Sequence, residues 1–214
     1  LMVSLQIGLK PHFAIVAIIT FILVLMAYPF LLTNDKAATG NKIVFGKPDK
    51  LILSLGLLVF FAAICEGGMF DWSGIYFREV VKEEIFTLGY LIFMAFMAGS
   101  RFFSDRLVHR VGMQKMYLLS ALVVSVGIAL VIIFPNFYSA LFGFSLVGIG
   151  VSSVFPMTFS LAGKSEKYSP GIAISLVATY AIIGMLLGPP LIGYLSHLVG
   201  LRFAFLVFLA AGLM

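Results

Sequence analysis

Two charged groups stand out in this otherwise apolar sequence, because their positions suit proton transfer or a switchable ionic contact. The first is Glu66, about fifteen residues into a long apolar run and so roughly 22 Å along a helix that rises 1.5 Å per residue. An ionised carboxylate at that depth of a bilayer is costly, so we expect Glu66 to be neutral, paired or facing a water-filled cavity. It would then act as a proton carrier or a substrate ligand.

The second group is the segment 99–115, in which one acid, Asp105, lies among four cations between two apolar runs: Arg101, Arg106, Arg110 and Lys115. An acid flanked by arginines at a helix end can form a charge-assisted pair with a neighbouring helix and lock one conformation of a moving bundle. The simpler alternative is a loop that sets the membrane topology and whose acid only balances its neighbours.

The residues after Glu66 extend the first group. Gly67 and Gly68 would permit local unwinding beside the carboxyl group, as transporters do at binding sites. Polar side chains elsewhere that we expect to face a cavity are Ser153, Thr158, Thr179 and Tyr180. For each of these hydroxyl groups, a role in packing one helix against another is the alternative.

Asp71, Trp72 and Tyr76 add an acid and two amphipathic rings one to three turns further along. The rings could stack on a sugar, and all three residues are further candidates for substrate or proton coupling. Anchoring at the membrane surface is the alternative. Because Asp71 and Arg78 are seven residues apart, they could form an ion pair near the outer surface.

The composition places these groups in a membrane. Hydrophobic residues make up 62% of the 214 residues, charged residues 11%, and the mean hydropathy is +1.14. A soluble domain of this size could not bury so much apolar surface. The single cysteine, Cys65, excludes an internal disulfide framework and provides neither a metal nor a redox site. No phosphate-binding loop is present, and the three histidines are far apart, which argues against an enzyme and against any cofactor.

Apolar runs separated by short polar turns predict an all-α membrane bundle of about seven transmembrane helices. Lys10–His12 is expected to form a turn after the end of an earlier helix at 1–9, and further turns are expected at 78–84 and 196–202. The last run, 203–214, is too short to cross, so both ends look truncated. The expected full spans are 13–32, 51–77, 85–103, 116–134, 137–163 and 171–195.

The distribution of Lys and Arg predicts the orientation of these spans. If they alternate, ten of the fourteen cations fall on one side, in the segments 33–50, 101–115 and 164–170. Because Lys and Arg are retained on the cytoplasmic side, we predict that these three segments are cytoplasmic. The net charge of +5 therefore reflects topology rather than binding to nucleic acid.

Small residues and prolines mark two spans for close packing. Small side chains at intervals of four lie on one helix face and let backbones approach. Pro156 and the pair Pro189-Pro190 each remove a backbone donor and predict kinks, which a rocking bundle would use. Static packing is the alternative. The small residues at this spacing are Gly148, Ser152, Gly171, Ser175, Thr179, Gly184 and Gly188.

Three stretches resemble the major facilitator superfamily. Gly99-x-Arg101-x-x-x-Asp105-Arg106-x-x-x-Arg110-x-Gly112, between two spans, resembles the conserved cytoplasmic loop of that family. The stretch 184–193, with Gly184, Gly188, Pro189, Pro190 and Gly193, resembles its eleventh helix. The stretch 66–76 is similar to the seventh helix of a bacterial branch related to sugar permeases such as the fucose permeases.

The resemblance implies that 51–214 is the C-terminal half of a twelve-helix transporter of the bacterial inner membrane. It makes 33–50 the linker and 1–32 the end of the N-terminal half. The implied partners are a small solute such as a sugar, protons, the lipid bilayer and the N-terminal half. An exporter of amphipathic compounds, a channel and a structural membrane protein remain alternatives. The resemblance implies latch roles for Asp105, Arg106, Arg110 and Gly112, and coupling roles for Glu66 and Asp71.

Overall fold

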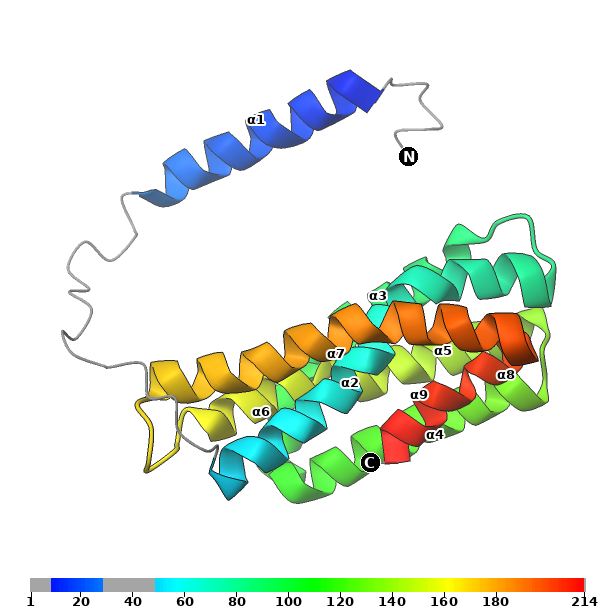
Figure 1. Ribbon diagram of the computed structural model, residues 1–214. Coiled ribbons are helices and arrows are strands. Elements are labelled where there is room, and N and C mark those ends of the chain that lie inside the picture. The colour runs from blue at the N-terminus through cyan, green and yellow to red at the C-terminus, as the bar shows by residue number, and fades with distance from the viewer. Residues whose placement is uncertain (1–8, 29–48, 214) are drawn as a thin grey trace. The chain divides into compact units, whose positions relative to one another are not determined.

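The computed structural model describes residues 9–28 and 49–213, whose secondary structure is entirely helical (Figure 1). The chain divides into two units, 1–46 and 47–214. In the first unit, helix α1 (Leu9–Ala27) includes Pro11. The turn predicted at residues 10–12 is therefore wrong, because proline is tolerated in the first turn of a helix, where the backbone N–H has no partner. The predicted linker lies outside the described residues except for Asp49 and Lys50.

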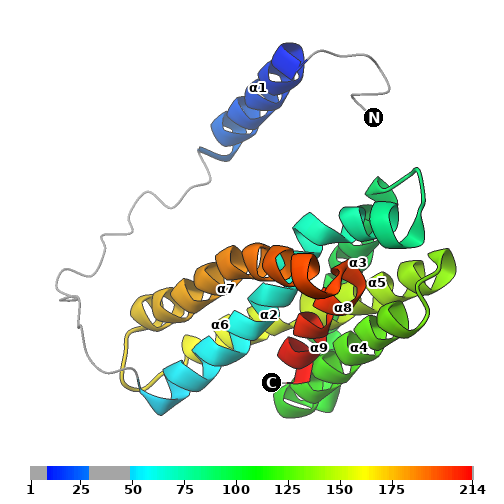
Figure 2. The ribbon, with the colours of Figure 1, turned by 45° about the vertical axis from the view of Figure 1, so that its right-hand side comes forward.

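The second unit is a helical bundle in which α2 and α7 run side by side in the same direction and α9 lies beside α4 (Figure 1, Figure 2). The described part of the chain contains five helices that are long and apolar enough to cross a membrane, together with shorter apolar helices near each end. The predicted all-α membrane bundle is therefore confirmed. The elements are α2 (Lys50–Tyr76), the π-helix η2 (Phe77–Val81), α3 (Thr87–Val111), α4 (Met113–Ile133), α5 (Phe137–Ser152), α6 (Val154–Ala162), α7 (Pro170–Val199), α8 (Leu201–Ala204) and α9 (Leu206–Leu213).

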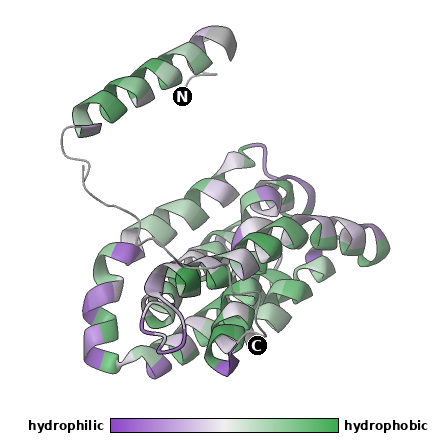
Figure 3. Ribbon diagram, turned by 60° about the vertical axis from the view of Figure 1, so that its left-hand side comes forward, coloured by the Kyte–Doolittle hydropathy of each residue, from purple (hydrophilic) through white to green (hydrophobic). Residues whose placement is uncertain are grey.

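Several helices extend beyond the apolar runs that predict them. Helix α3 continues to Val111, so most of the predicted loop at 101–115 is helical and the chain turns at Gly112. Gly112 has φ of 87° and Gly200, between α7 and α8, has φ of 82°, a backbone region that favours glycine. Charged side chains do not end these helices, because their long aliphatic stems reach toward water while the backbone stays hydrogen-bonded. Figure 3 shows hydrophilic residues mainly toward helix ends and turns.

Helices α2 and α7 approach closely because glycines replace larger side chains between them. A Cβ atom on Gly184 would collide with the carbonyl oxygen of Phe60, and one on Gly188 would lie 2.8 Å from the carbonyl oxygen of Ile64. Any other residue would push the helices apart. The spacing of four residues thus places these two glycines against the backbone of α2.

The two prolines of α7 lie inside a continuous helix. Because proline has no N–H, Pro189 leaves the carbonyl of Met185, four residues earlier, without its helical donor. Helix α2 contacts this turn at two points: a Cβ on Gly67 would lie 2.7 Å from the Met185 oxygen, and Trp72 Nε1 donates a 3.0 Å hydrogen bond to the Pro189 oxygen. Pro156 has a different effect, since the helix is interrupted at Ser153, between α5 and α6.

We predict that Gly184→Ala destabilises the full-length protein by about 1–3 kcal/mol, because the added methyl group overpacks the contact with α2. Thermal unfolding in detergent measures the effect. Gly171→Ala is the matched control, because a Cβ at Gly171 meets nothing within 4 Å. Equal unfolding midpoints for the two variants would contradict close packing at Gly184.

Candidate functional site

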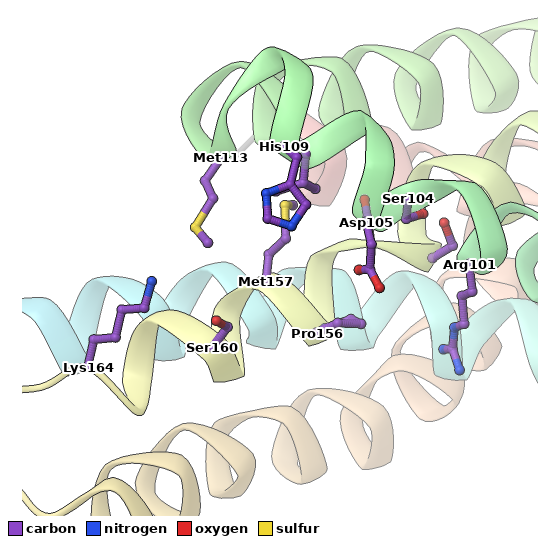
Figure 4. Close-up of a pocket in the computed structure, with 12 residues that line it drawn as sticks. Arg101, Ser104, Asp105, His109, Met113, Pro156, Met157, Ser160 and Lys164 are labelled. Carbon is purple, nitrogen blue, oxygen red and sulfur yellow. The ribbon is translucent and has the colours of Figure 1, made fainter.

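A pocket of about 430 Å³ lies between α3 and the α5–α6 pair (Figure 4). Its charged residues are Arg101, Asp105 and His109 on α3, and Lys164 after α6. The three residues of α3 follow at intervals of four, so they project from one face of that helix. In the predicted orientation, the pocket lies in the cytoplasmic half of the bundle. The remaining lining residues are Ser104, Val108, Met113, Ser152, Ser153, Pro156, Met157 and Ser160.

Arg101 lies well inside a membrane-spanning helix. It is the fifteenth of the 25 residues of α3, about 15 Å from the end of the helix at 1.5 Å per residue. The sequence analysis puts this residue where the span 85–103 meets the cytoplasmic segment 101–115, whereas the structure continues α3 for ten residues beyond it. A cation at this depth is expensive unless it faces water or a partner, and the pocket provides a polar surface for it.

The charges of the pocket are not cancelled by direct pairing. Over the ranges 9–28 and 49–213, the ion pair formed within 4 Å is Arg78–Glu79, outside the pocket. Arg101, Asp105 and Lys164 make no ion pair or hydrogen bond there through their side chains. These three groups are therefore available to a solute or to another part of the protein.

Glu66 is buried in the bundle, with 8% of its surface exposed. Within the described part of the chain, its carboxyl group has neither a hydrogen bond nor an ion pair, and Arg101 is the cation that attracts it electrostatically. The fold thus brings an acid of α2 into the electrostatic field of a cation of α3. Helix α2 is unbroken at Gly67 and Gly68, so the predicted local unwinding is absent there, and a Cβ on Gly68 would collide with the ring of Phe208.

The predicted ion pair between Asp71 and Arg78 is wrong. Arg78 Nη2 instead lies 3.5 Å from Glu79 Oε1, and both side chains are exposed. The π-helical turn of η2 begins at Phe77, and its extra residue per turn shifts Arg78 away from the stripe that holds Asp71. Asp71 itself is exposed at the edge of α2.

Tyr76 lies in the core rather than in the pocket or at the membrane surface. It is fully buried, its ring stacks on Phe205 at 4.7 Å between centroids, and its hydroxyl group donates a 2.8 Å hydrogen bond to the Val131 oxygen. Trp72 is half-buried against α7, where it holds the Pro189 carbonyl. These contacts favour packing roles for both aromatic residues.

Of the four predicted hydroxyl groups, Ser153 is the one that lines the pocket. Its oxygen lies 3.1 Å from the hydroxyl oxygen of Ser120, which ties α5–α6 to α4. Thr158 is fully buried and lies 3.0 Å from the hydroxyl oxygen of Tyr117. Thr179 is exposed and donates to the carbonyl of its own helix, and the ring of Tyr180 packs over Gly56.

The predicted latch residues are separated around α3. Asp105 faces the pocket, whereas Arg106 and Arg110 are exposed and do not line it. Gly112 forms the turn into α4. A locking contact of Asp105 with another helix stays a prediction, because no partner lies within 4 Å of it in the helices that are described.

Sequence reasoning missed Arg101 and did not identify His109 or Lys164 as site residues. The available signal was the spacing of four residues that links Arg101, Asp105 and His109. On a helix this spacing defines a single charged face. In a loop, side chains four residues apart share no face, so the reading of 99–115 as a loop hides this pattern. Lys164 comes from a distant part of the chain, so no local pattern identifies it.

The family model described as Major Facilitator Superfamily matches residues 2–167. The chain is 29% identical to the membrane protein MosC of Rhizobium meliloti, over 92% of this chain and 49% of MosC. It is 30% identical to an uncharacterised MFS-type transporter of Yersinia pestis, over 94% of this chain and 53% of that protein. It is 32% identical to an uncharacterised transporter of Sinorhizobium fredii, over 84% of this chain and 49% of that protein.

The chain spans about half the length of these curated relatives. No solved structure matches it significantly.

We predict that Tyr76→Phe lowers stability by about 1 kcal/mol, through loss of the hydrogen bond to Val131, and leaves the affinity for solute unchanged. Thermal unfolding and a concentration series of solute uptake measure the two quantities. Tyr194→Phe, at a tyrosine that is 68% exposed, is the control and should change neither. If Tyr76→Phe lowered the affinity for solute without lowering stability, Tyr76 would have to be assigned to the binding site rather than to the core.

Proposed function

Because this chain belongs to the major facilitator superfamily, we propose that it is the C-terminal half of a secondary transporter for a small polar solute. The chain is a multi-pass membrane protein. The proposed site of action is the bacterial inner membrane, where the two halves would rock about the solute in alternating access. The observation that carries the proposal is the pocket with Arg101, which lies ten residues before the end of a helix long enough to cross a membrane.

The pocket suits a small polar molecule. Its volume of about 430 Å³ lies in the range of roughly 300–1,000 Å³ that is typical of small-molecule sites. Four serines line it together with the charged groups, which favours a polar solute over an amphipathic one. A sugar is the solute class that the resemblance implies.

Glu66 is the group we propose to carry a proton. It is buried in α2, and Arg101, which lines the pocket, is the cation that acts on it electrostatically. Gain or loss of its proton changes the charge next to Arg101, so protonation and solute binding are coupled through that arginine. Coupling of this kind lets a proton gradient drive the solute.

The packing supports a rocking motion of stiff elements. The α2–α7 pair is held by glycine contacts, whereas α5–α6 is interrupted at Ser153. A stiff pair beside an interrupted helix permits one part of the half to bend while another holds its shape. We propose that Asp105, Arg106 and Arg110 hold one of the resulting conformations near the turn at Gly112.

The decisive experiment is solute uptake into proteoliposomes by the full-length protein, with and without an imposed proton gradient. We expect saturable uptake that follows the gradient in the wild-type protein. We predict that Glu66→Gln abolishes gradient-driven accumulation and retains exchange of solute across the membrane, because the amide cannot carry the proton.

Glu84→Gln is the matched control, since Glu84 is exposed after η2 and should leave coupled uptake unchanged. Gradient-driven uptake at the wild-type level in Glu66→Gln would remove Glu66 as the proton site. A non-saturating ion current in place of uptake would identify a channel and reject the transporter.

A further inference from the structure

We infer that the solute is a hydroxylated organic anion, a carboxylate or a phosphate ester, and that Arg101 binds its charged group in the pocket between α3 and α6. The inference rests on the proposed transport function and names its substrate class. Three independent observations support it: the charge of the pocket, the arrangement of its cations, and the hydrogen-bonding capacity of its serines.

The pocket has more positive than negative groups. Arg101 and Lys164 are cations, His109 is a further basic residue, and Asp105 is the acid among the lining residues. Within the described helices Arg101 forms no ion pair, and a cation inside a spanning helix is costly unless water or an anion faces it. An anion stabilises that arginine, and a guanidinium group binds carboxylate and phosphate oxygens through two parallel hydrogen bonds.

The cations lie at the two ends of the pocket. Figure 4 shows Arg101 at one end and Lys164 at the other, with Asp105 and His109 between them. Lys164 follows the end of α6 and so lies near the cytoplasmic mouth in the predicted orientation, whereas Arg101 lies deeper. An anion entering from the cytoplasm would meet Lys164 first and Arg101 last, and Asp105 would prevent it from resting midway.

The serines are suited to hydroxyl groups on the solute. The hydroxyl group of Ser104 donates a 2.8 Å hydrogen bond to the backbone carbonyl oxygen of Ser100, and that of Ser152 donates one of 2.7 Å to the carbonyl oxygen of Ile149. Their oxygens therefore keep lone pairs that can accept hydrogen bonds from a ligand. Ser160 makes no side-chain hydrogen bond within the described helices and is exposed to the pocket. A solute that bears hydroxyl groups beside its anionic group fits this lining.

The same geometry links the anion to the proton on Glu66. Glu66 is the acid on which Arg101 acts electrostatically. Protonation of Glu66 would remove a negative charge that competes with an incoming anion for Arg101. The anion and the proton would therefore enter together.

The test is thermal unfolding of the purified full-length protein with three probes at equal ionic strength: gluconate, glucose 6-phosphate and glucose. We expect one or both anions to raise the unfolding midpoint and glucose to leave it unchanged. The anion that acts distinguishes a carboxylate from a phosphate ligand. A shift with glucose equal to that of the anions, or no shift with either anion, would overturn the inference.

Variants assign the effect to Arg101. In Arg101→Gln we expect the affinity for the anion to fall roughly 10- to 100-fold, as for loss of hydrogen bonds to a charged group. Arg101→Lys keeps the positive charge and so serves as a control that distinguishes loss of anion binding from misfolding. We expect its affinity to lie between those of the wild type and Arg101→Gln. Glu66→Gln should bind the anion at least as tightly as the wild-type protein.

Lys115→Gln is the matched control, because it removes the same charge at an exposed position that does not line the pocket. It should bind the anion like the wild type.

Wild-type affinity in Arg101→Gln, or equal losses of affinity in Arg101→Gln and Lys115→Gln, would overturn the assignment. Saturable uptake of neutral glucose alone would reject the anionic class and leave the transport function standing, whereas anion binding without uptake of any solute would reject transport alone.

Discussion

The cost of placing a charge in hydrocarbon is the constraint on which this structure depends. Arg101 and Glu66 both lie within helices long enough to span a membrane, and neither forms an ion pair within the described bundle. The bundle accommodates them in two ways. Glu66 is buried among helices, and Arg101 faces a polar pocket that water or a solute can fill. Arg101 also acts electrostatically on Glu66, and we propose that this attraction couples the proton to the solute.

The rest of the bundle holds that site in place through close helix packing and through hydrogen bonds to its backbone carbonyl groups. Helix α2 is fixed against α7 at Gly184 and Gly188, where only glycine permits the approach. The last carbonyls of α4 are satisfied by Arg202, whose Nε donates to the Ile132 oxygen at 2.6 Å. Such contacts are needed because a backbone group without a partner is expensive where no water is available. The result is a stiff frame around the pocket.

The sequence predicts the class of fold well and the site only in part. Apolar length predicts the spans because crossing a bilayer requires it, and spacing by four correctly puts Gly184 and Gly188 on the face that meets α2. Apolar length fails at Arg101, because a charge ends an apolar run without ending a helix. Residue type alone misleads at Tyr76, whose ring is equally suited to stacking on a sugar or on Phe205. Lys164 joins the pocket only because the fold brings it near α3, and no pattern within the neighbouring sequence predicts such a contact.

The most direct test of the central claim is side-specific labelling at the pocket. Ser160→Cys, in a background without other reactive cysteines, would be exposed to a membrane-impermeant maleimide in right-side-out and inside-out vesicles of the full-length protein. Ser160 lines the pocket and is exposed to it. Labelling from the cytoplasmic side, slowed by the transported solute, is the predicted result. Labelling that is independent of solute, or that occurs only from the outer side, would contradict a solute pocket in the cytoplasmic half of the bundle.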